Sequence, residues 1–221
     1  MGYGFSESLE SGIIGEPYFI DSRVQGARGI PGDWRLVKEA GGGMLLDWGV
    51  HLIDQLMWMI KSPVKEVYAQ LLSVNFKDVD DNLKVLLKFE NGVCAQAQVD
   101  TNCFINYPRW HVSATDGTMV VEDWDCAGKI AKANTIAFNW EEGIVFTSTG
   151  RTKTMAPRPE RTVDILPLPD VSGRWEEFYY NVADVILNGA MPIVKTEEVL
   201  KVLEVMDACF LSSERGIAVR L

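Results

Sequence analysis

The sequence predicts an α+β fold in which a large, mostly antiparallel mixed sheet carries helices on one face and leaves the other face open. The order of the patterns indicates this class. A strand and a long helix come first, a run of short strands follows, and two helices and a last strand close the chain. Segregation of this kind is typical of helices packed on one side of an antiparallel sheet.

The first half of the chain is expected to form a strand, a long helix and three further strands. Residues 6–11 resemble the end of a helix that stops at Gly12, and residues 18–25 alternate as a strand does. A glycine triplet at residues 41–43 opens a helix that runs to about Lys61, before Pro63. Strands then follow at residues 64–74, 82–89 and 93–101, with a hairpin turn at residues 90–92.

The second half is expected to continue the sheet and to end in helices. Strands are predicted at residues 110–114, 118–122, 135–140 and 144–148. Residues 151–169 hold four prolines and are predicted to form a long loop. Helices at residues 173–187 and 196–213 and a short strand at residues 217–221 complete the chain.

The composition excludes several classes of function. The chain has 221 residues, and 31 acidic against 21 basic side chains give it a formal net charge of −10. This charge disfavours binding to nucleic acid and to anionic membranes. The start lacks a signal-peptide pattern, and polar residues interrupt the longest apolar stretch, residues 44–60. Four cysteines without a C-x-x-C pair indicate buried, reduced thiols. We expect a cytoplasmic protein.

The segment at residues 41–58 carries the pattern most relevant to chemistry. On a helix, Asp47, His51 and Asp54 fall at positions i, i+4 and i+7 and therefore share one face. The other faces of this helix are apolar, which predicts that it is buried. An unpaired buried polar group costs about 1–3 kcal/mol. The polar stripe is therefore expected to face a partner or a cavity.

Two interpretations of this stripe remain open on spacing alone. In the first, Asp47 and His51 simply bond each other or a neighbouring backbone group. In the second they form a reactive site, because histidine is the side chain best suited to proton transfer near neutral pH. The glycines favour the second interpretation, since a glycine triplet at a helix start leaves N–H groups open and permits close approach.

The glycine–Asp–His string resembles the signature of the glucose–fructose oxidoreductase and inositol dehydrogenase family (Gfo/Idh/MocA). The resemblance extends over essentially the whole chain. Weaker matches lie at residues 11–17, 81–82, 89–93, 115–118, 175–181, 192 and 212–219. Thr115 and Asp116 differ from the glycine and lysine that are usual in the family.

The resemblance implies the second domain of an NAD(P)-dependent oxidoreductase that acts on secondary alcohols of sugars or polyols. Residues 1–221 would form this single substrate-binding and oligomerisation domain, with residues 1–15 as a remnant of the connection to a Rossmann domain. No Rossmann fingerprint occurs here, so the dinucleotide, NAD or NADP, is expected to bind the intact enzyme and not this chain alone. His51 would act as general base, assisted by Asp47, which would orient the imidazole or the substrate hydroxyl. Gly42 and Gly43 would approach the cofactor.

Other residues extend the candidate site. Tyr107 occupies a position where the family often carries a tyrosine near the substrate, although a loop aromatic that covers the sheet is an equally simple interpretation. Trp34 and Arg35 precede the glycine triplet and are candidates for the mouth of the pocket, with surface packing as the alternative. Asp54 completes the polar stripe as a substrate contact. His111 is expected to be a plain sheet-face histidine.

Two functions of other classes compete with the oxidoreductase. A non-catalytic binding or dimerisation module of the same fold would bind no nicotinamide when joined to a Rossmann partner. A metal hydrolase would use Asp47, His51 and Asp54, but only two histidines exist, so we expect no metal.

The predicted sheet also suggests a homodimer or tetramer. Consecutive apolar residues at 85–87 and 119–121 indicate apolar side chains on both faces, whereas helices cover only one. A second copy of the sheet would cover the bare face, unless the loop at residues 151–169 folds back over it.

Overall fold

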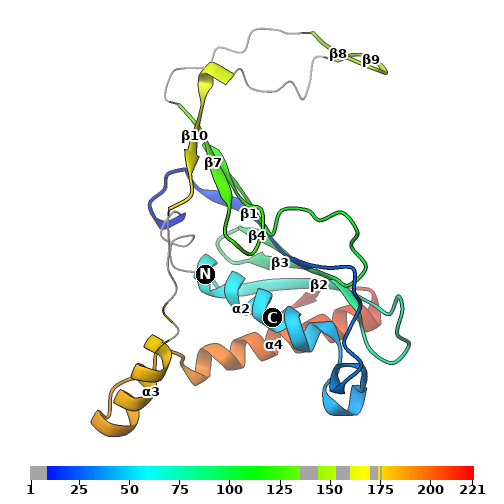
Figure 1. Cartoon of the computed structure of the whole chain (residues 1–221), viewed down its shortest axis with the longest axis vertical. Helices are drawn as coiled ribbons and strands as arrows, with labels where there is room; N and C mark the ends of the chain where they lie inside the picture. Colours follow the sequence, from blue (N-terminus) through cyan, green and yellow to red (C-terminus); the bar gives the residue numbers. More distant parts are fainter. Residues whose placement is uncertain (1–8, 135–143, 153–159, 170–173, 175) are drawn as a thin grey trace.

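The computed structural model describes residues 9–134, 144–152, 160–169, 174 and 176–221, and it confirms the α+β class. Nine strands form one sheet in the order β10-β7-β6-β5-β1-β4-β3-β2-β11 (Figure 1). All neighbours are antiparallel except β1 and β4. The strands are β1 (Pro17–Gln25), β2 (Val64–Leu72), β3 (Asn82–Phe89), β4 (Cys94–Asp100), β5 (Trp110–Ala114), β6 (Gly117–Val121), β7 (Gly128–Ala133), β10 (Val163–Pro167) and β11 (Val219–Arg220).

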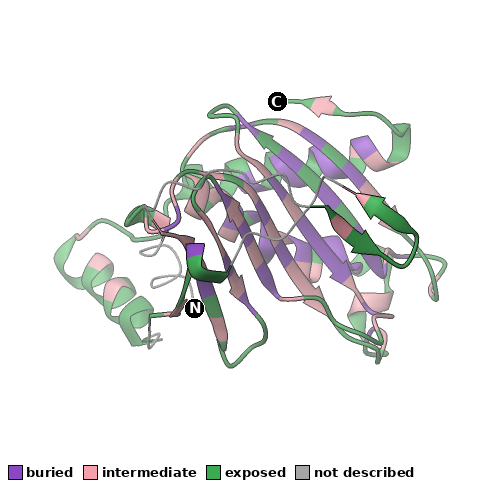
Figure 2. Ribbon diagram, turned by 90° about the horizontal axis from the view of Figure 1, so that it is seen from above, coloured by how far each residue is buried: buried purple, intermediate pink, exposed green. Residues whose placement is uncertain are grey.

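Two helices cover one face of this sheet. Helix α2 (Val50–Ile60) follows a π-helical turn, η3 (Leu45–Gly49), and packs beside α4 (Thr196–Arg215), which lies on β2. Both helices lie on the same side of the strands in Figures 1 and 2. Buried Ser212 joins α4 to the sheet, because its hydroxyl accepts the N–H of Ala69 at 2.9 Å and donates to the carbonyl of Ile217 at 2.6 Å. No helix of the described residues is long and apolar enough to cross a membrane.

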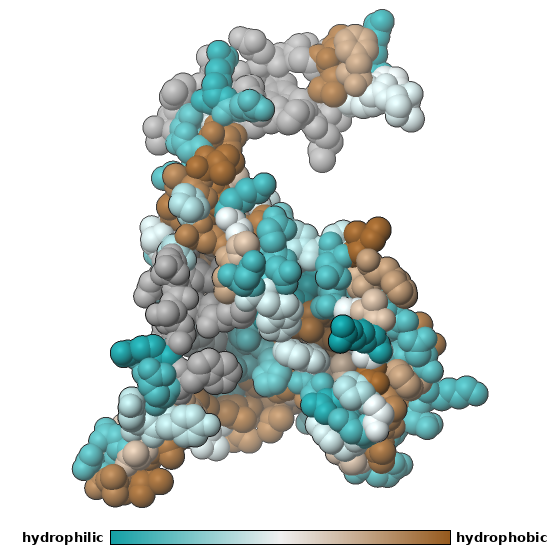
Figure 3. Space-filling view, in the orientation of Figure 1, coloured by the Kyte–Doolittle hydropathy of each residue, from teal (hydrophilic) through white to brown (hydrophobic). Residues whose placement is uncertain are grey.

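A third helix, α3 (Glu176–Asn188), has no buried residue among those described and projects from the body of the molecule (Figure 1). Its apolar side chains form a brown surface at one end of Figure 3. Exposed members include Phe178, Tyr179, Ile186 and Leu187. The hairpin of β8 (Val145–Thr147) and β9 (Gly150–Thr152) projects at the opposite end.

The core lies between the helices and the inner face of the sheet. On β3 the side chains of Leu83, Val85, Leu87 and Phe89 are buried, and the residues between them are exposed. This alternation continues across β4, where Ala97 lies opposite Val85. The period-two pattern thus sends one set of side chains to the helices, as expected for a half-covered sheet. The helices contribute Leu52, Ile53 and Leu56 from α2 and Val202, Val205, Met206 and Cys209 from α4.

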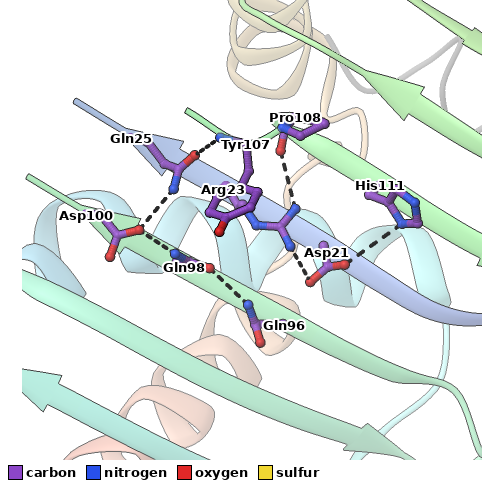
Figure 4. Close-up of polar contacts among 9 residues, drawn as sticks. All are labelled: Asp21, Arg23, Gln25, Gln96, Gln98, Asp100, Tyr107, Pro108 and His111. Carbon is purple, nitrogen blue, oxygen red and sulfur yellow. Dashed lines mark hydrogen bonds and ion pairs between the residues drawn. The ribbon is translucent and has the colours of Figure 1, made fainter. Parts of the chain in front are cut away.

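The open face of the sheet is polar, so the premise of a bare apolar face was wrong. Alternation places only Leu86 and Val120 of the two apolar triplets on this face. Between them lies a hydrogen-bonded network that Figure 4 shows in front of the helices. Its members are Asp21, Arg23, Gln25, Gln96, Gln98, Asp100 and His111. The expected sheet-face position of His111 is confirmed, with Nδ1 3.9 Å from Asp21 Oδ2.

Several predicted boundaries differ from the structure. Strand β7 was not predicted, because its sequence GKIAKA is poor in β-branched and aromatic residues. The expected loop at residues 151–169 instead contains η4 (Glu160–Thr162) and β10, which pairs with β7 at the edge of the sheet, so residues 160–167 do not cover the open face. An edge strand tolerates Pro167. The expected strand at residues 135–140 lies outside the described residues.

Candidate functional site

The glycine triplet brings two segments close to the start of the catalytic-candidate helix. The N–H groups of Gly42 and Gly43 donate to the carbonyls of Val37 at 2.9 Å and Arg35 at 3.0 Å. The next two N–H groups donate to the backbone carbonyl and the carboxylate of Asp80. The expectation that these N–H groups are open was therefore wrong, since the chain itself satisfies them.

Packing accounts for both buried glycines. A Cβ on Gly42 would lie 2.5 Å from the carbonyl oxygen of Arg35, and one on Gly43 would collide with the carboxylate of Asp80. Gly43 also has φ of +110°, a conformation that side chains other than glycine rarely adopt. The described contacts thus explain Gly42 and Gly43 without a bound cofactor.

The turn that follows is a π-helical turn instead of the expected α-helix. The N–H of Val50 donates to the carbonyl of Leu45, five residues earlier. The register of Asp47 relative to His51 therefore differs from that in a continuous α-helix. Both Asp47 and His51 are described, and no hydrogen bond or ion pair joins them. The mutual bond, one of the two interpretations that their spacing left open, therefore does not form.

Asp47 instead pairs with Arg35, which comes from η1 (Trp34–Leu36). The Arg35 Nε lies 3.0 Å from Asp47 Oδ2, and Arg35 NH1 lies 2.8 Å from Asp33 Oδ2. The hydrogen bond to Asp47 is the main cause that raises the pKa of Arg35. The guanidinium also lies 4.6 Å from the centre of the Trp34 ring. The structure thus brings Trp34, Arg35 and Asp47 together.

His51 lies on the first turn of α2 and is exposed. Its ring contacts Trp48 edge to face, with 5.8 Å between centroids. Asp54 lies one turn further along the helix, and its pKa is raised, mainly because burial disfavours the charged carboxylate. Glu198 of α4 adds to this rise, whereas the neighbouring His51 opposes it. His51 is thus an exposed imidazole between an aromatic ring and a carboxyl group, and no side chain or backbone group of the described residues hydrogen-bonds to it.

Tyr107 lies at a separate cavity. The cavity encloses about 110 Å³ at the end of β1 and β5 and is lined partly by Arg23, Gln25, Arg109 and Trp124. The Tyr107 N–H donates to Gln25 Oε1 at 2.9 Å, and the Arg23 guanidinium lies 5.6 Å from the Tyr107 ring (Figure 4). No contact joins Tyr107 to His51 among the described residues.

Trp124 lines the Tyr107 cavity and also contacts Trp48 beside His51. The sequence did not indicate this position of Trp124. Its ring lies 5.6 Å from the ring of Trp48, which in turn contacts His51. Spacing along the chain gives no signal for a contact between residues on η3 and on the β6–β7 hairpin. Nothing in the sequence therefore singled out Trp124.

The described residues offer little to a metal ion. No three His, Cys, Asp or Glu side chains in the described ranges gather into a metal-binding group. Asp47 faces a guanidinium, which differs from the ligand set that a metal hydrolase requires. Of the four free cysteines only Cys209 is buried, so the expectation of four buried thiols was wrong.

Comparison with known proteins identifies a matching domain family and several similar proteins. A family model described as the GFO/IDH/MocA C-terminal domain matches residues 5–120. A solved NAD-binding protein from Listeria innocua superposes with a TM-score of 0.93 at 44% identity, covering 99% of this chain and 63% of that protein. An uncharacterized oxidoreductase of Schizosaccharomyces pombe is 25% identical, covering 96% of this chain and 62% of its own length.

A third relative has a named substrate. The 1,5-anhydro-D-fructose reductase of Ensifer adhaerens is 30% identical over 120 residues, which cover 52% of this chain and 35% of the reductase. The chain spans less than two thirds of the length of the relatives that it matches along its whole length.

Proposed function

Because the chain belongs to the GFO/IDH/MocA C-terminal domain family, we propose that it is the substrate-binding part of an NAD(P)-dependent oxidoreductase acting on sugars or polyols. The observation that carries the proposal is the exposed His51 on α2, set one turn after the Asp47–Arg35 ion pair. The NAD-binding relative and the sugar-derivative reductase support the cofactor and substrate classes.

His51 takes the proton of the substrate hydroxyl in this proposal. An exposed imidazole beside a carboxyl group is suited to accept a proton near neutral pH. Asp54 lies one turn along α2 from His51, and the charges of the two side chains interact. A bound nicotinamide would supply the acceptor for the hydride of the carbinol carbon.

Asp47 is proposed to orient the substrate hydroxyl. Its Oδ2 is held by Arg35, and no bond directs it to the imidazole. The pair fixes the carboxylate in one position, since Arg35 is itself held by Asp33. A second hydroxyl of a sugar or polyol that donates to Asp47 would leave the reacting hydroxyl to donate to His51. Trp34 stacks on the Arg35 guanidinium and forms the outer wall of the proposed substrate site.

The described residues do not provide a phosphate cradle for the dinucleotide. The N–H groups at residues 42–45 are the candidates for binding a phosphate group, but they already donate to residues 35, 37 and 80. Dinucleotide affinity is therefore assigned to a nucleotide-binding domain joined to this chain. A homodimer or tetramer through the open face is also part of the proposal, with a polar interface in place of an apolar one.

The experiment compares the 221-residue chain with a longer polypeptide that carries a nucleotide-binding domain ahead of it. The chain alone is expected to bind NAD and NADP no tighter than millimolar, about −4 kcal/mol, and to oxidise no polyol. The longer polypeptide is expected to reduce NAD or NADP with at least one sugar or polyol. Micromolar binding by the chain alone in calorimetry would contradict the assignment. A longer polypeptide that shows neither nicotinamide binding nor turnover on a broad panel would favour the non-catalytic module.

A further inference from the structure

We propose that Trp124 is a positioning residue for His51 and acts through the ring of Trp48. This inference rests on the proposed role of His51. Trp124 comes from the hairpin between β6 and β7, far along the chain from α2. Its ring meets Trp48 at 5.6 Å between centroids with an interplanar angle of 62°. Trp48 meets His51 at 5.8 Å and 66°. One aromatic ring thus stands between Trp124 and the imidazole.

A buried cation holds the far side of this stack. The guanidinium carbon of Arg109 lies 3.6 Å from the centre of the Trp124 ring. The Arg109 residue is only 8% exposed, so its position is fixed by packing. Arginine over the face of an indole is a favourable cation–π arrangement. The order of contacts is therefore Arg109, Trp124, Trp48 and His51, and it runs from a buried anchor to an exposed imidazole.

The hairpin that carries Trp124 is built to hold the ring in place. The Glu122 N–H donates to the carbonyl of Ala127 at 2.7 Å, and the Ala127 N–H donates to Asp125 Oδ1 at 2.9 Å. Cys126 adopts a left-handed conformation with φ of 61°, which closes the turn. A short turn with this many internal bonds limits the movement of the indole that it presents.

The stack matters because nothing else in the described part fixes the His51 ring. No hydrogen bond orients the imidazole, and Asp47 bonds to Arg35. Trp48 is partly buried and packs against the core, and its ring also meets the ring of Trp124. Without Trp124, the Trp48 ring loses one of the two supports that set its angle, and the imidazole that rests on Trp48 loses its preferred orientation.

Nuclear magnetic resonance of the histidine rings in the 221-residue chain tests this inference without any turnover. The chain has two histidines, so a His111→Asn variant assigns both signals. The nearby Trp48 ring shifts the NMR signals of the His51 ring protons away from those of a free histidine. The Trp48→Leu variant shows where these signals lie when this effect is completely lost. Trp124→Leu is expected to move the His51 signals toward those of Trp48→Leu. The conservative Trp124→Phe is expected to keep them near their original position.

The control is Trp58→Leu, which removes an exposed indole from the opposite end of α2 and is expected to leave His51 unchanged. An unchanged His51 signal in Trp124→Leu overturns the inference, as does equal movement in Trp58→Leu. If Trp124→Leu does not fold, Trp124→Met takes its place, and an unchanged His51 signal in that variant overturns the inference.

Turnover by the longer polypeptide supplies the second readout. Trp124→Leu is expected to lower kcat about tenfold with little change in KM, because a small misplacement of a catalytic group costs rate more than binding. A rise in KM at unchanged kcat overturns the positioning role, and the proposed function would survive that result. Failure of the proposed function would instead appear as an active His51→Ala enzyme.

Discussion

Replacement of Asp81 by asparagine tests how the loop before β3 is held. Asp81 is completely buried, and both carboxylate oxygens accept hydrogen bonds. Oδ1 accepts the Val74 N–H at 2.8 Å and the Asn82 amide at 2.7 Å. Oδ2 accepts the N–H groups of Asn75 at 2.6 Å and Phe76 at 3.1 Å. One anionic side chain thus satisfies three backbone donors of the loop that joins β2 to β3.

The magnitude follows from the bonds that the amide cannot make. Asparagine keeps one acceptor oxygen, so the two donors that face Oδ2 lose their partner. A hydrogen bond to a charged group contributes about 1.5–3 kcal/mol. Because residues 74 and 75 are exposed, water replaces part of the loss. We therefore expect Asp81→Asn to lower the free energy of unfolding by about 2–4 kcal/mol, a large share of the roughly 5–15 kcal/mol typical of a domain.

Urea denaturation followed by circular dichroism measures this change, with Asp78→Asn as the matched control. Asp78 lies exposed on the same loop and is expected to change stability by less than about 0.5 kcal/mol. In a thermal scan the loss for Asp81→Asn corresponds to a Tm roughly 5–15 °C lower. Equal stability of the two variants would show that the Asp81 network does not hold the loop.

The dependence of this effect on pH has a definite sign. Burial by itself raises the pKa of Asp81, but the three backbone N–H donors and the Asn82 amide outweigh burial, so the pKa lies below its ordinary value. A lowered pKa stabilises the fold above the unfolded carboxyl pKa of about 3.9, and this contribution disappears as pH falls through the folded pKa. The gap between wild type and Asp81→Asn is therefore expected to narrow below about pH 4, and a gap that widens there would contradict the assignment.

Three further predictions concern packing, thiol reactivity and assembly. Gly43→Ala should lower the free energy of unfolding by about 1–3 kcal/mol or more, because Gly43 has a positive φ and lies against the Asp80 carboxylate. Gly32 has open space around it, so Gly32→Ala should be neutral in the same urea titration. Cys126 should react with a thiol reagent at pH 8 in the native chain, and Cys209 only after unfolding, because burial raises the pKa of its thiol to about 12; rapid native labelling of Cys209 would contradict this. Sedimentation at micromolar concentration should give a dimer or tetramer that dissociates as salt rises, since the open face is polar, and a monomer of 24.7 kDa would exclude that interface.

The sheet was largely predictable because its signal is local. Residues 82–89 were correctly predicted to form a strand, and the turn at residues 90–92 joins β3 to β4 as expected. The glycine triplet correctly marked the start of a helical segment, although this segment opens with the π-helical turn η3 and becomes an α-helix only at Val50. Strand β7 was missed because Gly, Lys and Ala carry a weak strand signal. The edge strand β10 was missed because the four prolines of residues 151–169 favoured a loop.

The partners of the site residues were not predictable because they depend on tertiary contacts. Helical spacing paired Asp47 with His51, but a π-helical turn intervenes and Arg35 takes the carboxylate. The consecutive apolar residues at 119–121 suggested a bare apolar face, yet only Val120 of the three lies there. Trp124 gave no signal, because its contact with Trp48 joins segments that only the folded sheet brings together.

The most direct test of the central claim compares two histidine variants of the longer, nicotinamide-binding polypeptide. His51 is exposed on α2, and His111 lies on the opposite, open face of the sheet. We expect His51→Ala to lower kcat about 10²–10⁴-fold on the true substrate, the range that a positioned general base contributes. His111→Ala is expected to keep near-normal kcat. Near-normal turnover of His51→Ala, or an equal loss in both variants, would contradict the assignment of the α2 site.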